Sequence, residues 1–329
     1  MIPCTHGRGR RRAIAGGLAL AAALLAGPAA AQGYPSRPIT FIVPFAAGSA
    51  TDLLARALGA SITQDTHQTV IVDNRAGAGG ILAAQAAARA APDGYTVLIT
   101  TNTTHAANEH LYRKLPYDPV KDFAPVTGLG KGGQVLVVRA DAPYRSVADL
   151  VADARKNPGK LSFGSGSSSS RVAGELLKQL THTDILHVPY KSNPNAITDL
   201  LGGQITFMIT DTATGVPQVK SGKLRALGVS TQQRIALLSD VPTLDEAGVK
   251  GYDMGYWFAA YVPAGTPAPL VARLHDLLVA GTKSASAASF YDSSGSQPWS
   301  TTPAELATFQ AAEAQKWGRV IKAAGIEPE

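Results

Sequence analysis

Short apolar runs that alternate with helical patterns are the feature that most constrains how this 329-residue chain can fold. Ile39–Val43 is a continuous apolar run of the kind that forms a buried strand. A loop of small residues follows, and residues 54–62 then carry large apolar side chains at helical spacing. Further apolar runs occur at residues 69–72, 95–100, 135–139, 161–163, 185–188, 205–210, 224–229 and 256–262. Two successive series of such units predict a parallel α/β sheet in two similar lobes, with a cleft between them.

The run Gly-Ser-Gly-Ser-Ser-Ser-Ser at residues 164–170 joins one of these strands to a helix. The first turn of a helix has free amide groups and a partial positive charge. Serine hydroxyls add donors, and glycine lets a ligand approach the backbone closely. A flexible linker or a plain serine N-cap would explain the same residues. The position of the run between two buried elements favours an anion-binding site, because ligands of open α/β sheets lie beyond the carboxyl ends of the strands.

The first 31 residues have the pattern of a secretory signal peptide, with arginines at 8–12, an apolar stretch at 13–27 and alanines at 29–31. The mature chain would then begin at Gln32, and the export route, general secretory or twin-arginine, stays open. Cys4 is the only cysteine, so the mature chain would have no disulfide, thiolate metal site or thiol nucleophile. The formal net charge of +6 includes four arginines of this segment, and the remainder shows no basic cluster that would bind nucleic acid.

Catalytic and cofactor motifs are absent from the sequence. It contains no Gly-x-Ser-x-Gly elbow, no Ser-x-x-Lys pair and no phosphate-binding loop. His182 and His187 are five residues apart around a turn, which is not the spacing of metal ligands on one helix face. We interpret them as structural or surface histidines. His105 follows a polar loop and can either touch the ligand or cap a helix, and we favour the cap. We therefore expect that this chain binds no metal or cofactor and is not an enzyme.

An ordered set of motifs runs through the chain from residue 34 to residue 318. It includes Ile-Val-Pro-Phe at 42–45, Thr-Asp-Leu-Leu-Ala-Arg at 51–56, Asp-Asn-Arg-Ala-Gly-Ala-Gly-Gly at 73–80, Leu-Pro-Tyr-Asp-Pro at 115–119, His-Val-Pro-Tyr-Lys at 187–191, Gly-Lys-Leu-Arg-Ala-Leu at 222–227, Pro-Ala-Gly-Thr-Pro at 263–267 and Lys-Trp-Gly at 316–318. The set resembles the substrate-binding proteins of tripartite tricarboxylate transporters, also called Bug receptors. The resemblance implies a periplasmic, type II binding-protein fold with two Rossmann-like lobes, which close on an organic carboxylate for a membrane transporter.

Carried over to this sequence, the family's first ligand loop falls on residues 45–52 and its second-lobe cradle on residues 164–170. The resemblance implies that backbone amides and ordered waters there hold one ligand carboxylate. Neither loop contains lysine or arginine, so neutral donors and helix ends must stabilise the charge. The chain departs from the family in the small residues after the phenylalanine and in Ser-Asn-Pro at 192–194. The residues expected to bind the ligand are Phe45, Ala46, Ala47, Gly48, Ser49, Thr51, Asp52, Asn102, Thr103, Thr104, Ser165, Gly166, Ser167, Ser168, Ser169, Tyr190, Asn193, Asp211 and Thr212.

Asp211 has two interpretations. It ends a strand and can bind an amine or hydroxyl of the ligand, or it can cap the helix that the sequence predicts at Thr212–Lys220. An ionised Asp211 would repel a second ligand carboxylate at short range, which favours the cap.

The sequence thus predicts a monomeric periplasmic receptor that captures a small organic acid for the permease subunits of a tripartite transporter. The ligand can be a dicarboxylate or tricarboxylate, an aromatic dicarboxylate such as terephthalate, or an amino or nicotinic acid, and the many hydroxyls favour a long, doubly anionic one. Two alternatives remain, a ligand-presenting partner of a sensor kinase and a periplasmic serine hydrolase. The expected parts are a signal peptide at 1–31, lobe 1 at 32–138 plus 257–329, and lobe 2 at 139–256, with a hinge near Val138 and Tyr256.

Overall fold

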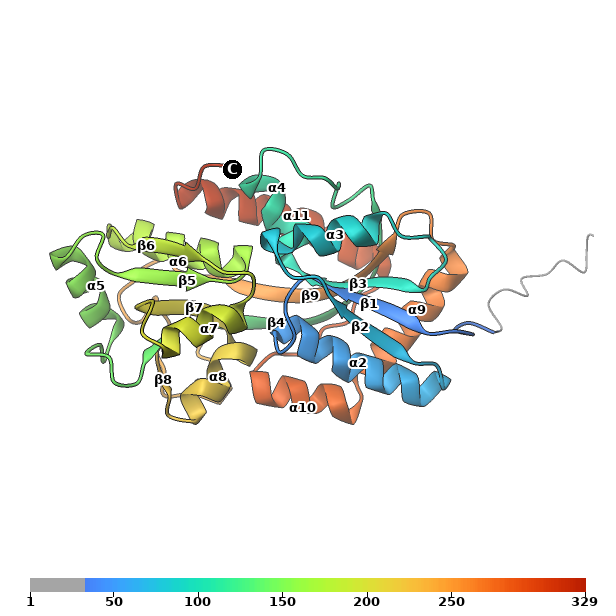
Figure 1. The fold of residues 1–329 in the computed structure, drawn as a ribbon, viewed down its shortest axis with the longest axis horizontal. Helices are drawn as coiled ribbons and strands as arrows, with labels where there is room; N and C mark the ends of the chain where they lie inside the picture. The colour runs from blue at the N-terminus through green and yellow to red at the C-terminus, as the bar shows by residue number, and fades with distance from the viewer. Residues whose placement is uncertain (1–32) are drawn as a thin grey trace, which may run out of the picture.

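The computed structural model describes residues 33–329, so the expected signal peptide at 1–31 lies outside the described residues. Within them, nine strands form one mixed sheet in the order β2-β1-β3-β9-β4-β7-β5-β6, with β8 paired to β4 (Figure 1). The strands are β1 (Ile39–Val43), β2 (Val70–Asn74), β3 (Thr96–Thr101), β4 (Phe123–Arg139), β5 (Ser162–Ser165), β6 (Leu186–Pro189), β7 (Phe207–Asp211), β8 (Leu224–Val229) and β9 (Gly255–Pro263).

Helices cover both faces of this sheet (Figure 1). The α-helices are α2 (Ala50–Thr66), α3 (Ile81–Ala88), α4 (Asn108–Leu111), α5 (Val147–Lys156), α6 (Ser168–Thr181), α7 (Asn193–Leu201), α8 (Thr212–Lys220), α9 (Ala268–Thr282), α10 (Ala285–Ser294) and α11 (Pro303–Ala323). Short turns of other helix types lie at η1 (Ala78–Gly80), η2 (Thr103–Ala107, a π-helix) and η3 (Ala236–Leu238). No helix between residues 33 and 329 is long and apolar enough to cross a membrane.

Two lobes share this sheet. In lobe 1, β1 runs parallel to β2 and β3, and β9 is antiparallel to β3. In lobe 2, β5 runs parallel to β6 and β7. The strand β4 belongs to both lobes, because it pairs with β9 as far as Gly133 and with β7 from Gln134 onward. The expected lobe boundaries at 138/139 and 256/257 stay a prediction, and we propose that the boundary on β4 lies at this change of partner.

The strand β4 is much longer than the expected strand at 135–139. Its first part is rich in glycine and proline, which normally argue against a strand. The glycines are needed because large aromatic rings lie directly against the backbone. A Cβ atom at Gly128 would collide with the Trp299 ring, and one at Gly132 would collide with Tyr256. The pairing with β9 also shifts register twice, so the periodicity of a regular strand is lost.

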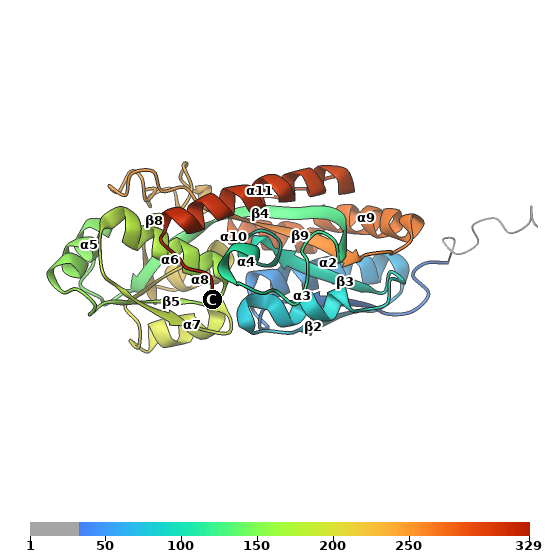
Figure 2. The same ribbon diagram turned by 90° about the horizontal axis from the view of Figure 1, so that it is seen from above.

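The helix α11 packs along both lobes (Figure 2). Thr302 caps it in a capping box with Glu305, and Pro303 is its first residue, a pattern typical of helix starts. Trp317 and Ile321 from this helix belong to the buried cluster that joins Leu98 of lobe 1 with residues of lobe 2. The two lobes are therefore connected by a continuous core as well as by shared strands.

His105 was interpreted as a helix cap, and that interpretation is wrong. The residue lies inside η2, and its fully buried ring stacks on Tyr261 with the ring centroids 3.9 Å apart. Its Nδ1 atom lies 2.8 Å from the Thr104 hydroxyl. The polar run before it concealed a π-helical turn that directs this side chain into the core.

Candidate functional site

A cleft between the two lobes encloses a cavity of about 30 Å³. Its lining comes from the loop between β1 and α2, the end of β3 and the start of η2, from β4 and β9, and from the N-terminal ends of α6, α7 and α8. The lining residues are Phe45, Ser49, Ala50, Thr51, Thr101, Asn102, Thr103, Gln134, Ser167, Ser169, Ser192, Asn193, Asp211, Tyr256 and Phe258. The polar segments singled out in the sequence therefore do meet at one place.

The cleft wall contributed by lobe 1 begins with the loop that leads into α2. Ser49 is the N-cap of α2, and its hydroxyl accepts a hydrogen bond from the amide of Asp52 (3.3 Å). Phe45 and Thr51 face the cleft with this serine, whereas Ala46, Ala47 and Gly48 do not line it. The N-terminal end of α2 thus borders the cavity, as the expected anion site requires.

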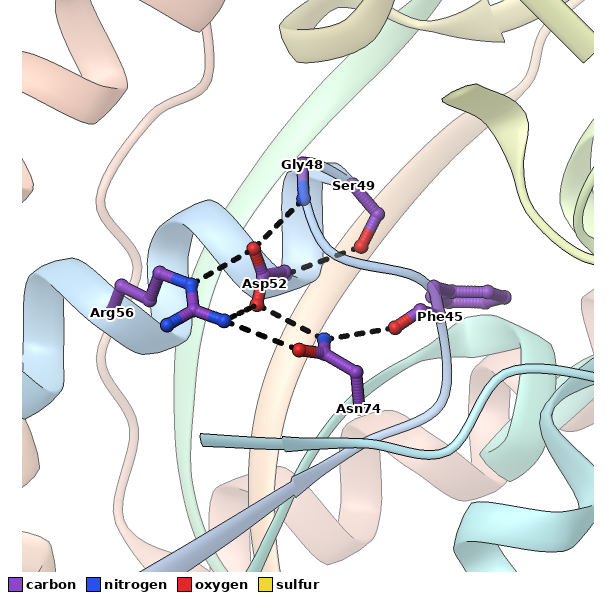
Figure 3. A network of polar contacts seen from close by, with 6 residues as sticks. All are labelled: Phe45, Gly48, Ser49, Asp52, Arg56 and Asn74. Atoms are coloured by element: carbon purple, nitrogen blue, oxygen red, sulfur yellow. Dashed lines mark hydrogen bonds and ion pairs between the residues drawn. The ribbon is translucent and has the colours of Figure 1, made fainter. Parts of the chain in front are cut away.

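Asp52 holds this loop in place (Figure 3) and does not itself line the cleft. Its carboxylate accepts hydrogen bonds from the amide of Gly48 (2.9 Å), the guanidinium of Arg56 (3.1 Å) and the side-chain amide of Asn74 (3.0 Å). The amide of Asn74 also donates to the carbonyl of Phe45 (2.9 Å). Burial alone would raise the pKa of Asp52, but these donors together hold it below its usual value. Asp52 therefore positions the loop from behind.

The serine run is largely the first turn of α6. Ser167 is the N-cap, in a capping box with Ser170, and its side chain borders the cleft. Ser167 is thus an N-cap that also borders the cleft, and its contact with a ligand stays a prediction. The backbone amide of Gly166 donates a hydrogen bond to Asn193 Oδ1 (3.0 Å). The hydroxyl oxygen of Ser165 lies 2.7 Å from His187 Nε2. Neither Gly166 nor Ser165 lines the cavity.

Direct hydrogen bonds join the start of α6 to lobe 1. The side-chain amide of Asn102 donates to Ser169 Oγ (2.7 Å), and the hydroxyl of Ser168 donates to Asn108 Oδ1 (2.7 Å). Thr103 Oγ1 also lies 3.3 Å from Ser169 Oγ. Ser168 thus contacts the other lobe outside the cleft lining, whereas Ser169 both lines the cleft and bridges the lobes.

The ends of β6 and β7 and the helices after them complete the lobe 2 wall. Asp211 is the N-cap of α8, as the sequence favours, and its Oδ1 atom accepts from the amide of Thr214 (2.8 Å). Its Oδ2 atom accepts from the side-chain amide of Asn193 (2.7 Å), the first residue of α7. Asp211 nevertheless lines the cleft, so the cap leaves room for a ligand contact. Contact with the ligand stays a prediction for every one of these residues.

Three of the expected site residues point elsewhere. The hydroxyl of Thr104 lies 2.6 Å from that of Thr100 within lobe 1. The hydroxyl of Tyr190 donates to Asp199 (2.9 Å), and Thr212 Oγ1 lies 3.1 Å from the hydroxyl of Tyr256. None of the three lines the cavity.

The expected site residues omit Ala50 and five polar or aromatic lining residues, Thr101, Gln134, Ser192, Tyr256 and Phe258. Ser192 is the N-cap position of α7, and Ser-Asn-Pro at 192–194 is a pattern that signals a helix start. Tyr256 and Phe258 are two apart on β9, the spacing that places side chains on one strand face. For Gln134, a polar residue within an apolar strand is the only sequence signal.

Neutral donors dominate the cleft. Its lining contains amides and hydroxyls, the N-terminal ends of four helices and one charged side chain, Asp211, with no lysine, arginine or histidine. Among residues 33–329, no three histidine, cysteine, aspartate or glutamate side chains form a cluster that could hold a metal ion. Such a lining suits a small anion held by hydrogen bonds, because helix N-termini stabilise negative charge without a neighbouring cation.

Similar solved structures have the same architecture. The protein Rpa4515 of R. palustris, solved with adipate, is 36% identical, with a TM-score of 0.86 over 90% of this chain and 100% of that one. The protein MatC of Rhodopseudomonas palustris, solved with bound malate, is 30% identical, with a TM-score of 0.83 over 88% of this chain and 100% of that one. The fold and the cleft therefore define an α/β periplasmic binding protein.

The family follows from the sequence comparisons. The model of the tripartite tricarboxylate transporter family receptor matches residues 54–326. A UPF0065 protein of Pseudomonas sp. strain P51, encoded in the tcbD-tcbE intergenic region, is 35% identical over 95% of this chain and 94% of its own length. The chain belongs to the family of tripartite tricarboxylate transporter receptors, as the motifs at residues 34–318 predict. The family and its structural neighbours are binding proteins.

Proposed function

We propose that residues 1–31 export this chain to the periplasm, where it captures a small organic carboxylate as a monomer and passes it to the membrane subunits of a tripartite tricarboxylate transporter. The observation that carries the proposal is the convergence of four helix N-termini on a cleft with no cationic side chain. In this proposal, one ligand carboxylate lies between the start of α2 and the start of α6, where Ser49, Thr51, Ser167 and Ser169 supply donors. The carboxylates bound to Rpa4515 and MatC support it.

A thermal-shift screen of the chain from Gln32 onward, followed by calorimetry, tests this function. The panel holds aliphatic, aromatic, hydroxy and amino carboxylates together with neutral sugars. A ligand at 100 times its Kd stabilises the fold by about 2.7 kcal/mol, which raises the melting temperature by a few degrees. We expect at least one carboxylate to bind and to be recovered unchanged. Binding of sugars alone, or conversion of the ligand, would contradict the proposal.

A matched pair of N-cap variants locates the site. Ser167→Ala and Ser284→Ala each remove a serine cap, from α6 and α10 respectively, but only Ser167 lines the cleft. Both should lose about 1 kcal/mol of stability. Only Ser167→Ala should weaken carboxylate binding, by roughly tenfold for one hydrogen bond to a charged group. Equal affinities in the two variants would place the carboxylate elsewhere.

A further inference from the structure

The cleft contains buried polar atoms that no other group in residues 33–329 satisfies. Gln134 is 1% exposed and Ser192 is fully buried, and both line the cleft. The Oε1 atom of Gln134 and the hydroxyl of Ser192 have no hydrogen-bond partner among the described residues. Buried polar atoms are rarely left unpaired, because an unmade hydrogen bond costs the desolvation of the group. These two atoms therefore point to a ligand group, and the amide oxygen of Gln134 requires a donor.

Asp211 adds a second acceptor to the same cavity. Its Oδ1 atom accepts from both the amide (2.8 Å) and the hydroxyl (2.7 Å) of Thr214, whereas its Oδ2 atom accepts only from Asn193 (2.7 Å). A carboxylate has about four acceptor positions, so Oδ2 can take another donor. Asn193 uses one of the two hydrogens of its side-chain amide for Asp211, and its Oδ1 atom already accepts from the amide of Gly166. The cleft lining contains no cation that would neutralise Asp211.

These acceptors restrict the second functional group of the ligand. A second carboxylate placed against Asp211 would set two like charges at short range with no cation between them. In the same place an ammonium group would donate to both Asp211 Oδ2 and Gln134 Oε1, and a hydroxyl group would donate to one of them. An unsubstituted hydrocarbon end would leave Gln134 Oε1 unpaired and the remaining acceptor position of Asp211 Oδ2 unused. A ligand that fits this cleft therefore carries a carboxylate at one position and a hydrogen-bond donor at another.

We propose that Asp211 and Gln134, with Ser192, receive a hydrogen-bond donor of the ligand, so that this chain selects monocarboxylates bearing an ammonium or hydroxyl group over dicarboxylates. The proposal rests on the carboxylate-receptor function proposed above. It also differs from the long, doubly anionic ligand that the hydroxyl-rich sequence favours. Asp211 thus has two roles, as the N-cap of α8 and as the residue that determines ligand charge.

Matched acids test the proposal by calorimetry. The four-carbon series is 2-aminobutyrate, 4-aminobutyrate, 2-hydroxybutyrate, 4-hydroxybutyrate, butyrate and succinate, and the six-carbon pair is 6-aminohexanoate and adipate. We expect at least one amino or hydroxy acid to bind at least tenfold more tightly than butyrate, succinate and adipate. The amino and hydroxy members separate the two kinds of donor. Succinate or adipate as the tightest ligand would overturn this proposal and leave the carboxylate receptor intact. Absence of binding by every acid of this series would overturn this proposal, whereas the receptor function is overturned only if the wider carboxylate panel also fails to bind.

The variant Asp211→Asn keeps an N-cap residue and the shape of the side chain but removes its charge. It should reduce the preference for the amino or hydroxy acid over succinate at least tenfold, whereas Asp65→Asn, an exposed charge removal on α2, should leave this ratio unchanged. Gln134→Met, which removes the amide oxygen at similar size, provides the same readout if Asp211→Asn fails to fold. An unchanged ratio in a folded Asp211→Asn or Gln134→Met variant would overturn the proposal.

Discussion

Asp52 illustrates how a single residue prepares the cleft without bordering it. Its side chain is only 2% exposed, and it joins the amide of Gly48, Arg56 and Asn74. Asp52→Ala should lower the free energy of unfolding by about 2–3 kcal/mol, because Gly48, Arg56 and Asn74 all lose their shared acceptor. It should also weaken carboxylate binding, since the loop that carries Ser49 is no longer fixed. Urea denaturation and calorimetry measure both effects, with exposed Asp276→Ala as the control. Unchanged stability would contradict this role.

The sequence reveals residue roles where the interaction is local. The N-cap favoured for Asp211 agrees with the structure, because its partner Thr214 lies three residues away. The capping boxes of Ser146 with Asp149 and of Thr302 with Glu305 are equally local. The sequence could not predict that the Asp52 side chain turns away from the cleft, since its partner Asn74 is 22 residues away on β2. The same limit applies to the unpaired oxygen of Gln134, whose burial depends on how both lobes meet.

At the scale of elements, the start of α6 fastens lobe 2 to lobe 1. Ser168→Ala and Asn108→Ala each break the hydrogen bond between their side chains, and the pair should show a coupling energy of about 0.5–1.5 kcal/mol in a double-mutant cycle. Each variant should also widen the separation of the lobes. Because Cys4 is the only cysteine, spin labels at Gln64→Cys on α2 and Lys156→Cys on α5 report this separation in the chain from Gln32 onward. Identical distance distributions would exclude a fastening role.

Gly166 controls how closely the starts of α6 and α7 approach. A Cβ atom there would overlap the backbone of Ser192 and Asn193. Gly166→Ala should therefore displace the two helix starts, abolish carboxylate binding and cost more than about 3 kcal/mol of stability. Gly202→Ala at the end of α7 is the control, since its nearest neighbour lies 3.5 Å from the added carbon. Similar denaturation midpoints for the two variants would contradict this prediction, because the backbone would then have moved to accommodate the added carbon.

Element boundaries were the part of the fold that patterns predicted least well. The expected strand 224–229 matches β8, but the polar run at 164–170, expected to join a strand to a helix, contains the first residues of α6. The helices α7 and α8 likewise begin with polar residues, Asn193 and Thr212. Serine, asparagine and threonine have modest helix propensity, so their presence in a first turn conceals where a helix starts. Residues at these helix starts nevertheless line the cleft between the lobes.

On the scale of the whole molecule, two histidines tie stability to pH. Burial lowers the pKa of His105 to about 3, and burial together with the charges of Arg171 and Lys178 lowers the pKa of His187 to about 4. Both histidines regain an ordinary pKa near 6.5 on unfolding. Between about pH 6.5 and pH 4 the unfolded chain therefore binds more protons than the native chain, and native stability must fall as the pH falls. Above about pH 6.5 the two histidines contribute no pH dependence.

We expect the free energy of unfolding to decline from pH 7 to pH 4.5 by at most about 1.4 kcal/mol per pH unit for each histidine. Urea denaturation at half-unit steps measures this slope. His187→Gln should make the slope shallower, because the glutamine binds no proton in either state and its amide can still meet the hydroxyl of Ser165. His182→Gln at the exposed end of α6 should leave the contribution of the buried pair in place. A slope that stays the same in His187→Gln would mean that carboxylates, not this histidine, govern the loss of stability in acid.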